Sequence, residues 1–225
     1  MDTIKEQIAF VREEIEKAKK RSGRTDDVTL IAVTKTVDTD RIRVAYEEGC
    51  TVLGENRVQE MMEKFDTFPD AHWHLIGHLQ KNKVKYVVGK AEMIHSVDSV
   101  ELLEEINRIA QKRGVVQDVL LEVNISGEIT KYGLTTAEIK DIMIKIGELV
   151  SVRVRGFMTM APKADEPDCI RWVFKKAKEL FDFYKKDYPS FDTLSMGMSG
   201  DYTVAVEEGA TIIRVGSLIF GKRNY

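Results

Sequence analysis

The stretch Val28-Thr-Leu-Ile-Ala-Val-Thr-Lys35 is a short apolar run, rich in β-branched residues, that ends on a lysine. It is too short to cross a membrane, and its composition favours a buried strand over a helix. Because side chains alternate along a strand, Ile31, Val33 and Lys35 share one face. If that face lines a closed barrel, the two apolar side chains fill its interior. The lysine then emerges at the carboxyl end of the strand.

Strand-like runs and amphipathic helical patterns alternate along the rest of the chain. Eight strands that alternate with helices predict a parallel sheet, and eight such units predict one (β/α)8 barrel domain over residues 1–225. A doubly wound open sheet is the second choice. No linker, low-complexity tract or longer repeat suggests a further domain. The predicted strands are Val28–Val33, Thr51–Leu53, His72–Ile76, Met93–Val97, Asp118–Ile125, Val152–Met158, Thr193–Ser195 and Thr211–Val215.

The first segment predicts a leading helix within residues 1–23. Its apolar residues recur at positions 4, 8, 11 and 15, which places them on one face of a helix. Thr3 and Glu6 have the spacing of a capping box, and Gly23 is a suitable residue to end the helix. We expect this stripe to pack against its own domain.

Composition excludes several classes of protein. The chain has 225 residues, 43% of them apolar, and a net charge of −3 from mixed charges, so neither nucleic acid nor an anionic membrane is an expected partner. Cys50 and Cys169 lie far apart and outside any metal-binding spacing. No signal peptide or membrane-spanning run is evident. We therefore expect a cytoplasmic globular protein without a metal site.

Lys35 has two readings when its own segment is considered alone. A lysine that ends a strand can simply point into solvent, as most charged side chains do. Alternatively, partial burial at the mouth of a barrel favours the neutral amine, which can attack a carbonyl carbon and form a Schiff base. The remainder of the chain has to decide between them.

The loops after the seventh and eighth predicted strands have features of phosphate sites, and such loops bind phosphate in many barrels. Ser199 is placed at the start of a short helix, where free N–H groups attract an anion. Gly216 allows the backbone to approach a ligand, and Ser217 begins another helix. Arg214 shares a strand face with Gly216, so it should point inward and need an acceptor. Alone, Ser199 is more simply a helix cap and Gly216 a tight turn, but together with Lys35 they form a more specific combination.

Six motifs occur in order along the chain: Ala32-Val-Thr-Lys35-Thr, Gly54-Glu-Asn56-Arg-Val-Gln-Glu60, His74-Leu-Ile-Gly77-His-Leu-Gln80-Lys-Asn82-Lys, Arg155-Gly156-Phe-Met158, Leu194-Ser-Met-Gly-Met-Ser199 and Arg214-Val-Gly-Ser217-Leu-Ile-Phe-Gly221. Together they resemble the pyridoxal-phosphate homeostasis protein family, also called proline synthase co-transcribed homologues. That family in turn resembles the N-terminal barrel of alanine racemase. The similarity extends over nearly the whole chain from Val28 to Tyr225.

The resemblance implies a binding site for pyridoxal 5'-phosphate (PLP). It implies that Lys35 holds PLP as a Schiff base and that Arg214 faces the pyridine nitrogen. Ser199, Gly216 and Ser217 would bind the phosphate group. The resemblance also places Asn56 and His74 in motifs that line the pocket.

The same resemblance implies a PLP carrier or regulator more than an enzyme. An arginine can only donate hydrogen bonds, so the pyridine nitrogen should stay unprotonated and stabilise carbanions poorly. The additional domain and partner subunit that complete alanine racemase are not expected here. We therefore expect a monomer that buffers PLP or delivers it to PLP-requiring apoenzymes, with little or no amino-acid catalysis.

Two other functions remain open at the level of sequence. A single-domain amino-acid racemase would need a second acid or base, for which Tyr132, Tyr202 and His74 are candidates. A cofactor-free aldolase would use Lys35 directly on a sugar phosphate. Lys131 lies in a predicted loop, and the sequence leaves its role open. The four histidines lack the spacing of zinc ligands, so we do not expect them to bind a metal.

Overall fold

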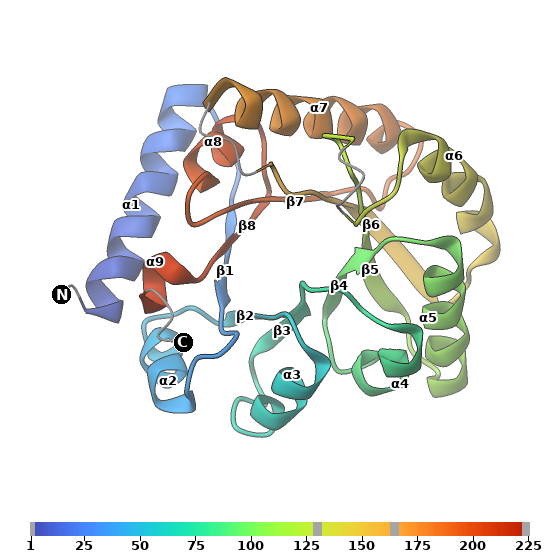
Figure 1. Cartoon of the computed structure of the whole chain (residues 1–225), viewed down its shortest axis with the longest axis horizontal. Coiled ribbons are helices and arrows are strands. Elements are labelled where there is room, and N and C mark those ends of the chain that lie inside the picture. Colours follow the sequence, from blue (N-terminus) through green and yellow to red (C-terminus); the bar gives the residue numbers. More distant parts are fainter. Residues whose placement is uncertain (1–2, 128–131, 163–166, 222–225) are drawn as a thin grey trace.

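The computed structural model describes residues 3–127, 132–162 and 167–221, and in them eight parallel strands close into a barrel in sequence order. Figure 1 looks along this barrel and shows the helices on its outside. The predicted (β/α)8 barrel with a leading helix is therefore confirmed. The strands are β1 Thr29–Val33, β2 Val52–Glu55, β3 His72–Leu75, β4 Met93–Val97, β5 Gln117–Glu122, β6 Val152–Met158, β7 Thr193–Met198 and β8 Ile212–Val215.

The helices follow the strands in the alternating order that the sequence predicts. None of those in the described residues is long and apolar enough to cross a membrane. They are α1 Ile4–Ser22, α2 Thr39–Glu47, α3 Val58–Phe65, α4 Val84–Val87, α5 Val100–Arg113, α6 Thr136–Lys145, α7 Pro167–Lys185, α8 Tyr202–Glu207 and α9 Ser217–Phe220, with 3-10 turns η1 Lys81–Lys83 and η2 Ile146–Glu148.

Most strand boundaries agree with the sequence to within one or two residues, but two strands differ for physical reasons. Strand β7 continues to Met198, because Gly197 has a φ of 92° and the register against β8 shifts before Met198, which pairs with Arg214. A glycine-containing segment that reads as a loop is thus an irregular strand end. Strand β5 stops at Glu122, and Val123 makes an isolated bridge to Leu134 instead.

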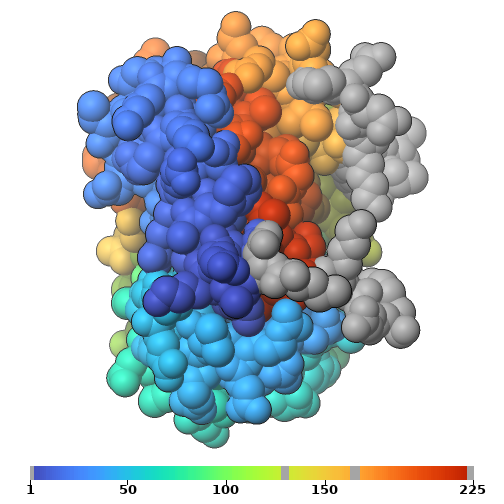
Figure 2. Space-filling view, turned by 90° about the vertical axis from the view of Figure 1, so that its left-hand side faces the viewer, coloured from blue at the N-terminus to red at the C-terminus, as the bar shows by residue number. Residues whose placement is uncertain are grey.

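Helix α1 begins and ends at the predicted residues. The N–H of Glu6 donates to the Thr3 hydroxyl at 3.2 Å, and the Glu6 carboxylate accepts the Thr3 N–H at 2.6 Å, which completes the capping box. Gly23 ends the helix with a φ of 69°. The helix lies beside α2, α8 and α9, and Figure 2 shows it in dark blue against the red C-terminal segment. Its apolar stripe therefore packs on its own domain, as expected.

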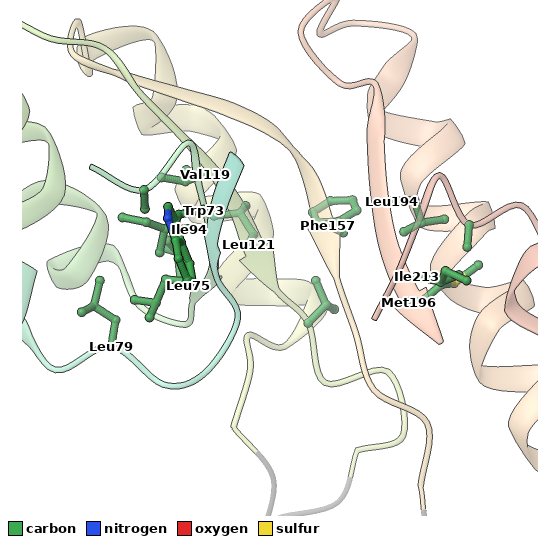
Figure 3. Close-up of a cluster of buried hydrophobic side chains, with 14 of the residues drawn as sticks. Trp73, Leu75, Leu79, Ile94, Val119, Leu121, Phe157, Leu194, Met196 and Ile213 are labelled. Atoms are coloured by element: carbon green, nitrogen blue, oxygen red, sulfur yellow. The ribbon is translucent and has the colours of Figure 1, made fainter. Parts of the chain in front are cut away.

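Two apolar clusters follow from the alternation of side chains along the strands. The inward-facing cluster fills the barrel and consists of Ile31, Val33, Met93, Leu120, Met158 and Ile212. The alternate residues face outward and pack under the helices in a larger cluster. Figure 3 shows part of this outer core on strands β3 to β8, including Trp73, Leu121, Phe157 and Ile213.

The inward-facing positions become polar toward the carboxyl ends of the strands. Two residues after the apolar Met93, Leu120 and Ile212 come His95 on β4, Glu122 on β5 and Arg214 on β8, and all three are buried. Polar side chains in the interior of a barrel need partners to offset their lost hydration. This polar layer therefore marks the end of the barrel where the site lies.

Candidate cofactor site

A cavity of about 590 Å³ opens at the carboxyl ends of strands β1, β2, β7 and β8. Its volume is in the range of roughly 300–1,000 Å³ that is usual for small-molecule sites. The structure brings together six of the seven residues that the sequence assigns to cofactor binding. Those that line the cavity are Lys35, Asn56, Ser199, Arg214, Gly216 and Ser217.

Lys35 lies in the turn that follows β1, and both of its neighbours are fixed. The Thr34 N–H donates to the Gly54 carbonyl at 2.9 Å, which ties the turn to β2. Thr36 has a φ of 60°, a left-handed conformation that is costly for a β-branched residue. Its N–H donates to the Glu60 carboxylate at 2.8 Å. The lysine is therefore presented to the cavity from a constrained backbone.

A buried polar cluster supports this turn from the outer side of the barrel. The Lys64 ammonium lies 2.7 Å from Glu55 Oε1 and donates to the Thr34 carbonyl at 2.8 Å. The Thr34 hydroxyl donates to the same Glu55 oxygen at 2.6 Å. Burial raises the pKa of Glu55, while Lys64 and Thr34 oppose that shift. Sequence reasoning missed this cluster, because Thr34 and Glu55 lie on the outer strand face, away from the site, and Lys64 lies on α3.

Ser199 lies at the predicted loop but not at the predicted helix. Its hydroxyl accepts N–H groups from Gly216 at 3.2 Å and Leu218 at 3.4 Å, so it bridges to the start of α9. The expectation that it begins the helix after strand seven is wrong. The Asp201 carboxylate instead accepts the Met198 N–H at 2.5 Å and closes a tight turn before α8.

Gly216 is predicted to let the backbone approach a ligand, and the structure shows that it also lets two strand ends pack closely. Its φ is −123°, which other residues can adopt. A Cβ atom at this position would lie 3.1 Å from Val33 Cβ and 3.2 Å from the Val33 carbonyl oxygen. Any larger residue would press on Val33, because the ends of β8 and β1 approach each other closely.

Arg214 points into the barrel, as predicted, and is only 4% exposed. It donates from Nη1 to the Ser195 hydroxyl at 2.6 Å and from Nη2 to the Thr159 carbonyl at 3.1 Å. Burial lowers the pKa of Arg214 to about 10, against the opposing charges of Asp201 and Glu122. The guanidinium therefore remains positively charged at neutral pH.

His74 does not line the cavity but lies beneath it. Its Nδ1 is 2.8 Å from His95 Nε2, and His95 Nδ1 is 3.0 Å from the Ser195 hydroxyl. Burial lowers the pKa of His74 to about 4 and holds the pKa of His95 well below its usual value, so both rings are neutral at pH 7. Within the described residues, no group of three or more His, Cys, Asp or Glu side chains is placed to hold a metal ion.

Arg41 is a cavity residue that sequence reasoning missed. It lies on α2, and its guanidinium donates to the Phe220 carbonyl across the cavity edge. Nothing in its spacing distinguishes it from an ordinary surface arginine. With Lys35 and Arg214 it provides three basic side chains, and none of the described residues that line the cavity is acidic. The cavity therefore suits an anion.

The candidates for a second acid or base lie elsewhere. Tyr132 is 63% exposed and stacks on His78 at a ring distance of 4.7 Å. Tyr202 is buried in α8, where burial raises the pKa of its hydroxyl. Neither lines the cavity, and nor does His74. Lys131 lies outside the described residues.

This barrel belongs to a known class of domain: the family model described as "Alanine racemase, N-terminal domain" matches residues 8–224. Alanine racemase of Clostridium difficile shares this fold with a TM-score of 0.77 at 14% identity, and the match covers 98% of this chain and 60% of that one. A protein of Aquifex aeolicus named pyridoxal phosphate homeostasis protein is 45% identical over 224 residues, 98% of each chain. This chain therefore belongs to the pyridoxal phosphate homeostasis protein family.

A solved relative adds a bound state. PipY of Synechococcus elongatus is 36% identical to this chain, and the match covers 97% of this chain and all of PipY. Its structure without PLP superposes with a TM-score of 0.88 and its structure with PLP bound with a TM-score of 0.85. The resemblance read from the six motifs is thus confirmed over the whole barrel.

Proposed function

We propose that this protein binds PLP in the cavity, holds it as a Schiff base on Lys35, and buffers or delivers it. The observation that carries the proposal is the meeting, in one cavity, of a lysine with two arginines and a serine-and-glycine loop. These groups match the parts of PLP, which has an aldehyde, a ring nitrogen and a dianionic phosphate. The structure of PipY with PLP bound supports PLP as the ligand.

The residues present fit this cofactor in charge and in hydrogen-bonding capacity. Ser199, Gly216 and Ser217 would bind the phosphate, with Arg41 adding positive charge at the rim. The Asn56 side-chain oxygen is buried without a hydrogen-bond partner and borders the cavity. Buried polar atoms are normally satisfied, so an unpartnered oxygen at a cavity wall is consistent with a ligand contact.

Each residue has a separate task in this proposal. Lys35 would supply the amine that attacks the aldehyde carbon, from a turn whose backbone Thr34 and Thr36 hold in place. Bound PLP supplies an electrophilic aldehyde and, when its ring nitrogen is protonated, an electron sink. Arg214 donates only, so it would hold the ring nitrogen unprotonated and limit carbanion chemistry. Little amino-acid catalysis is expected, because neither tyrosine candidate reaches the cavity.

The biological role extends this proposal to partners and location. Delivery of PLP to apoenzymes requires that the cofactor can leave. A cavity that opens at the barrel mouth is compatible with that. Both cysteines are free thiols, Cys50 buried and Cys169 exposed, which supports a reducing, cytoplasmic location. We further propose that the protein acts as a monomer.

Replacing Lys35 with alanine tests the central assignment. We expect Lys35→Ala to lose the visible absorbance of the PLP Schiff base, because no other amine is proposed to attack the aldehyde. Borohydride reduction of the unmodified protein, followed by peptide mapping, should place the adduct on Lys35. Lys112→Ala, at an exposed lysine near the end of α5, is the matched control and should keep the spectrum. A colourless protein that takes up no added PLP would reject the proposal.

Replacing Ser199 with alanine tests the phosphate assignment. We expect Ser199→Ala to weaken PLP binding by about tenfold or more, the effect of losing one hydrogen bond to a charged group. Binding of pyridoxal, which has no phosphate, should change little. Fluorescence titration with both ligands makes the comparison within one variant. Equal losses for the two ligands would place the phosphate elsewhere.

A further inference from the structure

Four inward-facing side chains form a continuous hydrogen-bonded chain across the barrel interior. Arg214 on β8 contacts Ser195 on β7, Ser195 contacts His95 on β4, and His95 contacts His74 on β3. The three distances are 2.6, 3.0 and 2.8 Å, and all four side chains are buried. Only Arg214 lines the cavity. The other three are connected to the cavity lining through Arg214.

The direction of these hydrogen bonds follows from the donors and acceptors available. Arg214 can only donate, so the Ser195 oxygen accepts from it. Among the described residues, that hydroxyl contacts one other group, His95 Nδ1. If the hydroxyl hydrogen is to have an acceptor, it must point at Nδ1. His95 then carries its hydrogen on Nε2 and donates to His74.

The same logic fixes the tautomer of the last ring. His74 Nδ1 accepts from His95, so the hydrogen of neutral His74 is on Nε2. The opposite direction would place both hydrogens on Nδ1 and leave the Ser195 hydroxyl hydrogen without an acceptor. Burying such a group unsatisfied is costly. The two arrangements are therefore distinct and differ in both rings.

The groups around the chain leave Arg214 without a directly bonded anion. Its two acceptors in the described structure, the Ser195 hydroxyl and the Thr159 carbonyl, are uncharged. Glu122 and Asp201 act on it only through longer-range charge. At the far end, His74 feels Glu92 and His72, which pair with each other at 2.5 Å. A carboxylate at the position of His95 would instead neutralise part of the positive charge.

We propose that Ser195, His95 and His74 form a one-way hydrogen-bond chain that holds Arg214 as a fully charged donor toward the ring nitrogen of bound PLP. His95 and His74 are positioning residues in this arrangement, and Ser195 transmits their effect. The part that concerns PLP rests on the proposed function. The direction of the chain does not, because it is built into the protein without cofactor.

Nitrogen-15 NMR of the histidine side chains in the cofactor-free protein tests the direction. Neutral Nδ1–H and Nε2–H tautomers give different chemical shifts at the two ring nitrogens. At pH 7 we expect both His74 and His95 to be neutral Nε2–H tautomers. Nδ1–H tautomers, or a protonated ring in either residue, would overturn the proposal. This result is independent of whether the protein binds PLP.

Variants at His95 test the effect on the site. His95→Leu removes the acceptor of the Ser195 hydrogen, so we expect PLP affinity to fall about tenfold and the absorbance spectrum of bound PLP to change. His95→Gln keeps an acceptor and should restore both in large part. His72→Leu, an exposed histidine outside the chain, is the control. A folded His95→Leu protein with unchanged affinity and spectrum would overturn the proposal.

The two experiments separate the possible failures. If His95→Leu does not fold, the NMR measurement on the unmodified protein still decides the direction of the chain. If the unmodified protein binds no PLP, the proposed function fails, whatever the tautomers are. If PLP binds but the tautomers are reversed, only this inference fails.

Discussion

Replacing Lys64 with methionine is expected to lower the free energy of unfolding by roughly 3–5 kcal/mol at neutral pH, the usual cost of breaking a buried ion pair. The Glu55 side chain is 0% exposed, and its second oxygen has no hydrogen-bond partner. Without the Lys64 ammonium, the Thr34 hydroxyl is left as the sole donor to this carboxylate among the contacts in the described structure. Denaturant unfolding of Lys64→Met measures the loss.

Two controls separate this effect from a general loss of packing. The double variant Glu55→Gln with Lys64→Met removes both charges and should recover much of the stability, since no buried charge is left unpaired. Lys17→Met breaks ion pairs of similar length, 2.7 and 2.8 Å, on an exposed face of α1 and should cost far less. Equal losses at Lys17 and Lys64 would contradict the expectation.

The stability lost in Lys64→Met should also depend on pH, because it depends on whether Glu55 is ionised. Burial raises the folded-state pKa of Glu55 above its usual value of 4.5, and removing Lys64 takes away a group that lowers it. A raised carboxyl pKa contributes stability that is present below the unfolded-state pKa and lost as pH rises through the folded-state pKa. The deficit of Lys64→Met should therefore be smallest near pH 4 and grow toward neutral pH.

The architecture could be predicted from sequence because its signals are local. A run such as Val28–Val33 identifies a strand by composition, and the following amphipathic pattern identifies its helix. Repeating this unit leaves few topologies, of which the closed barrel is one. Period-two alternation alone likewise places Arg214 and Gly216 on one strand face and predicts that the Arg214 side chain points inward. Each of these steps uses neighbours in the chain.

The parts of the site that escaped prediction depend on contacts between distant segments. His95 and Ser195 are 100 residues apart, and their contact requires the barrel to close. Arg41 reaches the cavity through its hydrogen bond to the Phe220 carbonyl, 179 residues further along the chain, which no local pattern encodes. Ser199 does not begin the helix after strand seven, because a turn closed by the Asp201 side chain separates it from α8. Such side-chain contacts join segments that are distant in sequence, so they can be identified only once the fold is known.

Glu122 is expected to make the free energy of unfolding depend strongly on pH. It is a carboxyl group in the polar layer of the barrel and is only 5% exposed. Burial raises the pKa of Glu122 to about 7; Asp98 adds to the shift and Arg214 opposes it. The raised pKa means that Glu122 contributes stability below about pH 4.5, and that this contribution is lost as pH rises through about 7. The protein therefore loses stability when this side chain ionises.

Replacing Glu122 with glutamine removes that ionisation, so we expect the stability of Glu122→Gln relative to the unmodified protein to rise between about pH 4.5 and pH 7 and to level off above pH 7. The difference between about 7 and 4.5, at about 1.4 kcal/mol per pH unit, sets an upper limit of about 3.5 kcal/mol. Unfolding free energies measured from about pH 4 to pH 9, a range that includes both pKa values, test this. Glu104→Gln, at an exposed carboxylate on α5, should show no such trend. Parallel curves for Glu122→Gln and the unmodified protein would mean that Glu122 is already ionised at acid pH, and that the barrel mouth is better hydrated than its burial indicates.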